Sequence, residues 1–164
     1  MELTHSDLKE KHIKLVDTQW KLREKLQEKA AQLLQEYIAS LSLNSSFWTD
    51  SEGNKRSYAE IGEVNSSGEF LPVPFPRLGM DKDYKVNFVL ATVMDDSPMT
   101  GGARHGVNIS LMYADYRLWA TVGSGDDAVA FPVSEADGGF FEVCAAIKAM
   151  INYSLDSAMP KVSL

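Results

Sequence analysis

Apolar residues recur at helical spacing through the first forty residues of the chain. The main stripe, interrupted by the polar residues His12 and Gln19, consists of Leu8, Leu15, Leu22, Leu26, Ala30, Leu33, Tyr37 and Leu41. Good helix formers fill the other positions, and no glycine or proline occurs before Gly53. Thr4 followed by Asp7 matches a capping box, with Ser6 as a competing cap. The pattern predicts one long helix over residues 1–44.

The width of this stripe changes along the predicted helix. From Leu33 onward further apolar residues join it, which indicates that the second half packs on a body and that the first half projects or pairs with another helix. Ile13, Val16 and Trp20 lie off the main stripe, among charged residues. Large exposed apolar groups usually mark interfaces, so these three residues are candidate interface residues, with a packed second face as the alternative. The seven-residue repeat is too short and too broken to predict a coiled coil.

The region 45–133 has the short apolar runs and turn residues typical of strands. The candidate strands are residues 47–50, 57–64, 70–76, 84–94, 107–122 and 128–133. The run 84–94 is the most apolar and is expected at the centre of an antiparallel sheet of about four to six strands. In 107–122 the alternation slips at Ala114-Asp115, which favours a tight hairpin over a bulge.

Proline alternates with large apolar residues in the segment 70–76. In an extended chain Pro72, Pro74 and Pro76 would all lack their amide on the same edge, leaving the other edge to pair. We therefore expect an edge strand or a polyproline-like strap over the sheet. A proline-rich ligand motif is the alternative.

A closing helix is predicted within residues 134–164, with Ser134 or Asp137 as its cap. Its expected buried stripe is Phe140, Cys144, Ile147, Ile151 and Leu155. Strands segregated between two helices indicate a single α+β domain in which the C-terminal helix packs on the sheet.

Composition narrows the classes of function. The 164 residues are 45% hydrophobic and 24% charged, ordinary values for a globular domain. The polar N-terminus predicts no signal peptide, and no apolar run is long enough to cross a membrane. With one cysteine, Cys144, these features favour the cytoplasm.

Charge is unevenly distributed along the chain. Residues 1–56 hold 9 basic and 9 acidic side chains, whereas residues 57–164 hold 7 basic and 14 acidic ones and carry the whole net charge of −7. An acidic body disfavours nucleic acid and favours a cationic protein partner.

Residues 95–106 are the strongest candidate for chemistry. This segment follows the most apolar strand and combines carboxylates with an imidazole and a guanidinium. We hypothesise that Asp95 or Asp96 forms an acid–base pair with His105 and that Arg104 binds an anion. A solvated hairpin loop is the alternative.

Other catalytic signatures are missing from the sequence. We expect no metal site and no cofactor, because the three histidines and one cysteine have no ligand spacing and neither glycine-rich turn ends as a P-loop does. The leading hypothesis is a non-enzymatic acidic protein-binding module of inhibitor, immunity or adaptor type, from a bacterial cell or a mobile element. The alternatives are a small-ligand-binding domain or small enzyme using the loop, and a homodimeric subunit joined through the first helix.

Overall fold

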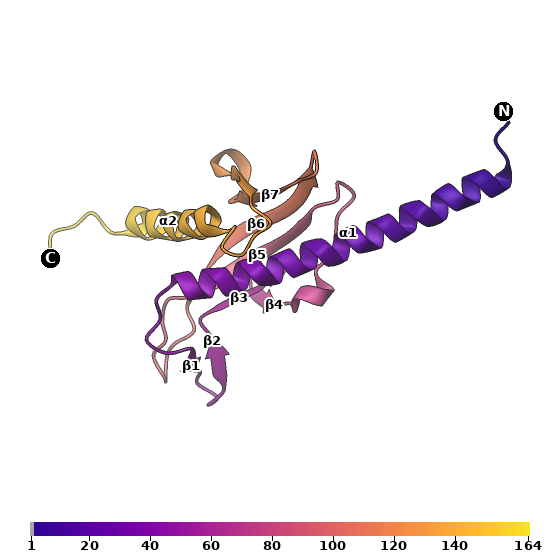
Figure 1. Ribbon diagram of the computed structural model, residues 1–164. Helices are drawn as coiled ribbons and strands as arrows, with labels where there is room; N and C mark the ends of the chain where they lie inside the picture. Colours follow the sequence, from indigo (N-terminus) through magenta and orange to yellow (C-terminus); the bar gives the residue numbers. More distant parts are fainter. Residues whose placement is uncertain (1) are drawn as a thin grey trace.

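The predicted order of helix, strands and helix is present in the computed structural model, which describes residues 2–164 (Figure 1). The α+β class is therefore confirmed. The elements in chain order are α1 (His5–Ser40), β1 (Phe47–Thr49), β2 (Lys55–Ser57), β3 (Ala59–Val64), β4 (Phe70–Pro72), the 3-10 turn η1 (Phe75–Arg77), β5 (Val86–Val93), β6 (Arg104–Ala114), β7 (Arg117–Val122), the 3-10 turn η2 (Gly125–Asp127), β8 (Val129–Val133) and α2 (Phe141–Ala158).

Six of the strands form one antiparallel sheet in the order β4-β3-β5-β6-β7-β8, and β1 and β2 form a separate hairpin. The most apolar strand, β5, lies between β3 and β6, as its composition predicted. β4 pairs with β3 alone, so the proline-containing segment does form an edge strand before it continues into η1. The tight hairpin is also confirmed, because β6 and β7 pair across Asp115 and Tyr116, whose φ angles are 51° and 62°.

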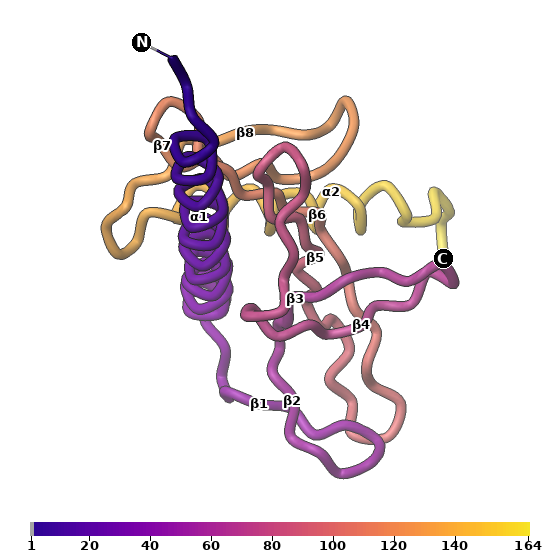
Figure 2. The backbone as a smooth tube through the Cα atoms, turned by 90° about the vertical axis from the view of Figure 1, so that its right-hand side faces the viewer, coloured from indigo at the N-terminus to yellow at the C-terminus, as the bar shows by residue number. Residues whose placement is uncertain are grey.

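Both helices contribute to one hydrophobic core against a single face of the sheet. Paired residues of the two longest strands, such as Phe88 with Ile109 and Leu90 with Val107, are buried on that face. Their neighbours Asn87 and Asn108 are exposed on the other face. Tyr37 of α1 is fully buried, and its hydroxyl lies 2.8 Å from that of Thr92 of β5. Figure 2 shows α1 along one side of the strands.

The beginning of α2 differs from the prediction of a Ser134 or Asp137 cap. The helix starts at Phe141, and Phe140 at its N-cap position has no side-chain cap. The Glu36 carboxylate of α1 accepts a hydrogen bond of 3.1 Å from the Phe140 amide instead. A residue more than a hundred positions away thus takes the role that the N3 side chain has in a capping box, that of accepting from the N-cap amide.

Two further boundaries and one burial prediction are corrected by the structure. α1 ends at Ser40 and not at residue 44, because Leu41 closes a 3-10 turn and Ser42 adopts a φ of 52°. The predicted strand over 57–64 is divided at Tyr58 between the small hairpin and the main sheet. Leu155, predicted to be buried, is 44% exposed near the end of α2. Cys144 is buried as expected.

A candidate docking surface on the projecting helix

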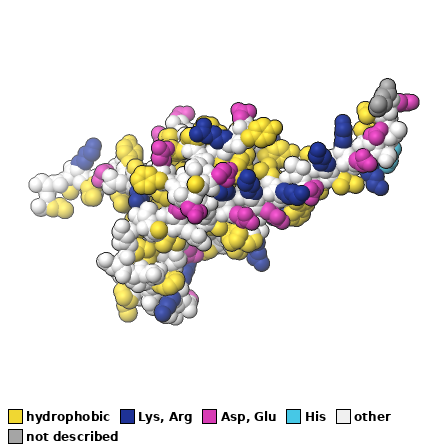
Figure 3. All heavy atoms as spheres, in the orientation of Figure 1, with side chains coloured by type: hydrophobic (Ala, Val, Ile, Leu, Met, Phe, Trp, Pro, Cys, Tyr) yellow, Lys and Arg dark blue, Asp and Glu magenta, His cyan; other side chains and the backbone are white. Residues whose placement is uncertain are grey.

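The N-terminal half of α1 extends beyond the body of the protein (Figure 1). Every residue from Leu8 through Thr18 is exposed, and burial of the helix begins near Leu22. The predicted projection of this half is therefore confirmed. Leu8 and Leu15 continue the buried stripe of α1 into solvent, where no part of residues 2–164 covers them. Figure 3 shows charged side chains of both signs along this part of the helix, with hydrophobic ones between them.

The three candidate interface residues lie on this exposed half. Ile13 is 57% exposed, Val16 37% and Trp20 56%. Their spacing of three and four residues places them along one strip of the helix surface. The structure therefore places these residues together in solvent and excludes the alternative of a packed second face.

Local interactions define the start of the helix. The Thr4 hydroxyl accepts from the Asp7 amide at 3.2 Å, and the Asp7 carboxylate accepts from the Thr4 amide at 2.9 Å, which completes the predicted capping box. These hydrogen bonds to Thr4 lower the pKa of Asp7 below its usual value. One turn before the body, Lys21 pairs with Asp17 at 2.9 Å. The projecting half is thus organised by its own sequence and not by contacts with the sheet.

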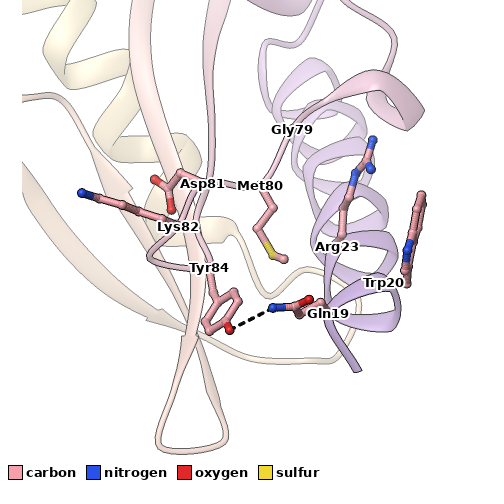
Figure 4. Close-up of a pocket in the computed structure, with 8 residues that line it drawn as sticks. All are labelled: Gln19, Trp20, Arg23, Gly79, Met80, Asp81, Lys82 and Tyr84. Carbon is pink, nitrogen blue, oxygen red and sulfur yellow. Dashed lines mark hydrogen bonds between the residues drawn. The ribbon is translucent and has the colours of Figure 1, made fainter. Parts of the chain in front are cut away.

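An open notch lies where α1 leaves the body (Figure 4). It has a volume of about 630 Å³ and is formed by α1 and the loop before β5. Its lining residues are Gln19, Trp20, Arg23, Gly79, Met80, Asp81, Lys82 and Tyr84. Met80 and Tyr84 reach from the loop toward the helix, and the Gln19 side-chain amide donates to the Tyr84 hydroxyl at 3.2 Å. The Lys82 side chain points away from α1.

Two buried attachments set the position of this loop. The side-chain amide of Gln27, which is 7% exposed, donates to the carbonyls of Pro76 at 3.2 Å and Leu78 at 2.7 Å. Leu78 itself is fully buried in the core. Gln27 therefore ties α1 to the segment from which the loop begins.

The loop also has an internal turn centred on Asp81. Its carboxylate accepts from the amides of Asp83 and Lys85, each at 2.9 Å, and from the Asn87 side chain at 2.8 Å. These hydrogen bonds, that to Lys85 foremost, lower the pKa of Asp81. Tyr84 takes a φ of 61°, a conformation uncommon outside glycine. The turn thus holds the Tyr84 ring at the notch.

One cation and one aromatic ring lie on the α1 side of the notch. The Arg23 guanidinium lies 5.2 Å from the centre of the Trp20 ring. The Arg23 Nε is buried and has no hydrogen-bond partner among residues 2–164. The surface therefore offers a flat apolar ring beside a cation, a combination that residues at protein interfaces often provide.

The loop before β6 was the other candidate site, and the structure separates its members. Arg104 and His105 belong to β6 and not to the loop, so the connection is shorter than the segment 95–106. Neighbouring strand residues point to opposite faces of a sheet, and these two side chains therefore diverge. His105 lies opposite Thr92 in the sheet, next to the core. In the described part of the chain, no hydrogen bond or ion pair joins His105 to Asp95 or Asp96.

The two carboxylates of this loop serve local roles. Asp95 accepts from the Ser97 amide at 3.0 Å, and hydrogen bonding to Ser97 lowers the pKa of Asp95. Asp96 accepts from the Tyr58 hydroxyl at 2.7 Å. Both acids therefore have local structural roles, in agreement with the alternative that this segment is a solvated hairpin loop.

Arg104 lies in a half-buried cluster on the outer face of the sheet. It pairs with Glu60 at 3.7 Å, and Arg56 pairs with the same carboxylate at 2.8 Å. The guanidinium carbon of Arg104 also lies 5.4 Å from the centre of the Phe70 ring. The expected anion site at Arg104 is thus occupied by a carboxylate of the chain itself.

Sequence reasoning missed the notch. The strand expected over 84–94 includes Tyr84, whereas β5 begins at Val86, and the sequence predicts no element over 79–83. The one available signal was Asp81-Lys82-Asp83, a run typical of a turn, placed directly before the most apolar strand. Nothing in the sequence indicated that this turn would meet α1 some sixty residues away.

Comparisons with family models, curated proteins and solved structures give no match to this chain. Within residues 2–164 no three metal-ligating side chains lie close enough to hold an ion. No helix in the same range has an apolar stretch that would span a bilayer. Conclusions about function therefore rest on the geometry of the projecting helix and the notch.

Proposed function

We propose that the chain is a non-enzymatic protein-binding module that engages its partner through the projecting half of α1 and the adjoining notch. The observation that carries this proposal is the exposure of Ile13, Val16 and Trp20 on a helix that leaves the body. Helices of about a dozen residues are marginally stable in water unless a partner packs on them. An amphipathic helix laid against a complementary surface is a recurrent mode of protein recognition.

Charge supports the same class of function. The net charge of −7 lies in the body, which favours a cationic protein over nucleic acid as a further contact. An inhibitor, immunity or adaptor protein of a bacterial cytoplasm or mobile element has these properties. A small enzyme or ligand-binding domain using residues 95–106 is the alternative, and the divergence of Arg104 and His105 weighs against it.

Affinity capture from the native host tests this proposal. The tagged chain is compared with the Ile13→Ser/Val16→Ser/Trp20→Ser variant, at low and moderate salt, and captured proteins are quantified by mass spectrometry. We expect capture of a stoichiometric protein, whether a different protein or the untagged chain itself, to fall at least about tenfold with the variant, since central aromatic contacts carry much of an interface's binding energy.

A matched control separates this effect from nonspecific binding through exposed aromatic side chains. Tyr153→Ala removes an aromatic side chain that is 73% exposed on α2, far from the projecting half in sequence. The control should capture as much partner as the wild type. Equal capture by the Ile13/Val16/Trp20 variant would reject the proposal, and a small-molecule screen directed at Arg104 and His105 would then follow.

A further inference from the structure

We infer that the protein docked on α1 is a second copy of this chain, paired antiparallel so that the N-terminal end of each helix lies at the notch of the other. This inference rests on the proposed function and names the partner of the same surface. Three properties of the described residues point to it: the position of the body, the order of the apolar residues and the order of the charges.

The body restricts the direction in which another helix can lie. From Leu22 onward the side of α1 that carries Leu26, Leu33 and Tyr37 is covered by the sheet. A parallel partner on the exposed continuation of that side would run into the body, and its own body would compete for the same space. Because the N-terminal half of α1 extends away from the body (Figure 1), an antiparallel partner places each body beyond the other's N-terminus.

The apolar residues of the projecting half suit such a pairing. Leu8 and Leu15 border one side of the exposed face, and Ile13 and Trp20 border the other, with Val16 between them. The segment from Leu8 to Trp20 is about 20 Å long at the rise of an α-helix. With the helices antiparallel and centred near residue 14, like edges of the two faces meet, so that Leu15 of each copy lies beside Leu15 of the other and Ile13 beside Ile13. All five apolar residues then leave solvent together.

Charge selects the same direction. Residues 2–10 carry Glu2, Asp7 and Glu10 against one lysine, a net charge of −2, whereas residues 21–25 carry two lysines and Arg23 against one glutamate, a net charge of +2. Antiparallel pairing brings these opposite ends together, and parallel pairing brings like ends together.

The notch supplies a specific contact for this arrangement. Arg23 takes part in none of the ion pairs formed among residues 2–164. In the antiparallel pair it meets the acidic first turns of the second copy.

Sedimentation equilibrium of the full chain between about 10 and 200 µM tests the pairing, a range that detects micromolar association. We expect a reversible dimer whose dissociation constant rises about 30-fold in Trp20→Ala, the effect of losing a central aromatic contact. Tyr153→Ala, the exposed control on α2, should leave the constant unchanged. A wild-type chain that remains monomeric throughout would overturn the inference.

Disulfide trapping tests the orientation. His5 and Arg23 lie near the centre line of the exposed face and equally far from residue 14, and the native Cys144 is buried. A mixture of His5→Cys and Arg23→Cys chains should form mixed disulfide dimers. Dimers of His5→Cys with itself would show a parallel pair and would overturn the inference.

These results separate the two proposals. If the wild type is monomeric, and if it captures a different protein that the Ile13→Ser/Val16→Ser/Trp20→Ser variant does not capture, the inference is overturned and the proposed function stands. A dimer that tolerates Trp20→Ala and gives no mixed disulfide overturns the inference, because the contact then lies elsewhere; if the triple variant also captures as much protein as the wild type, both proposals fail.

Discussion

Replacing Gln27 with leucine removes the attachment between α1 and the loop that forms the notch. Gln27 is 7% exposed, and its amide donates to two carbonyls, those of Pro76 and Leu78. The change removes both hydrogen bonds and leaves the two carbonyl oxygens without this donor. Each buried polar group that loses its partner lowers the free energy of unfolding by about 1–3 kcal/mol. Leucine regains part of this through apolar burial, worth about 1–2 kcal/mol. We expect a net loss of about 2 kcal/mol in the free energy of unfolding.

Urea denaturation followed by tryptophan fluorescence and by far-ultraviolet circular dichroism measures this loss. Coincident transitions would justify a two-state treatment. Gln35→Leu, an exposed substitution of the same kind on α1, is the matched control and should stay within about 0.5 kcal/mol of the wild type. If Gln27→Leu is as stable as the control, the two hydrogen bonds do not hold the loop and the reasoning fails.

Three further predictions concern two buried side chains of the core and the first turn of α1. Tyr37→Phe removes the buried hydroxyl contact with Thr92 and should lower the free energy of unfolding by about 1–2 kcal/mol, with Thr92→Val adding little to it in the double variant; additive losses in urea denaturation would contradict the pairing. Burial raises the pKa of Cys144 to about 11, so an aromatic disulfide reagent at about pH 8 should modify it only in urea, and rapid labelling of the native chain would refute its burial. Hydrogen bonds to Thr4 lower the folded-state pKa of Asp7, so the capping contribution is present above the usual aspartate pKa of about 3.9 and is lost as the pH falls through the lowered value. The first turn should then fray while the sheet persists, and NMR shifts of the Thr4 and Asp7 amides that stay constant through this acid range would count against the capping box.

Features with a local cause were predictable from the sequence. The phase slip at Ala114-Asp115 predicted the hairpin because alternation fixes which face each residue occupies, and a slip requires a turn or a bulge. The alternating prolines predicted the edge position of Phe70–Pro72 because proline removes donors on one side. Thr4 and Asp7 predicted the start of α1 because a capping box needs only nearby residues.

Features with a distant cause were not predictable. Leu8 and Leu26 belong to one stripe and differ only in whether the body reaches them. The partner of the Phe140 amide is Glu36, on the other helix, so a search for a cap near Ser134 found the wrong residue. Such contacts depend on how the helices pack, which no local spacing encodes.

The candidate sites also differ in whether nearby residues or the packing of the fold decide their structure. The position of Trp20 off the stripe, among charges, left exposure and a packed second face as alternatives, and the structure shows that Trp20 is exposed. The proposed pairing of His105 with Asp95 assumed that residues close in sequence share a site. The strand extends to Arg104, and its alternation separates them.

Hydrogen–deuterium exchange of α1 tests the central claim, that its projecting half is a protein-docking surface, most directly. In the dilute chain the amides of residues 8–18 should exchange far faster than those of residues 26–37, because no other part of the described chain covers them. On association, with a second copy or with a captured partner, protection should appear in residues 8–23 and in the loop at 79–84. Protection confined to the open face of the sheet or to residues 94–103, with the projecting half unchanged, would contradict the account.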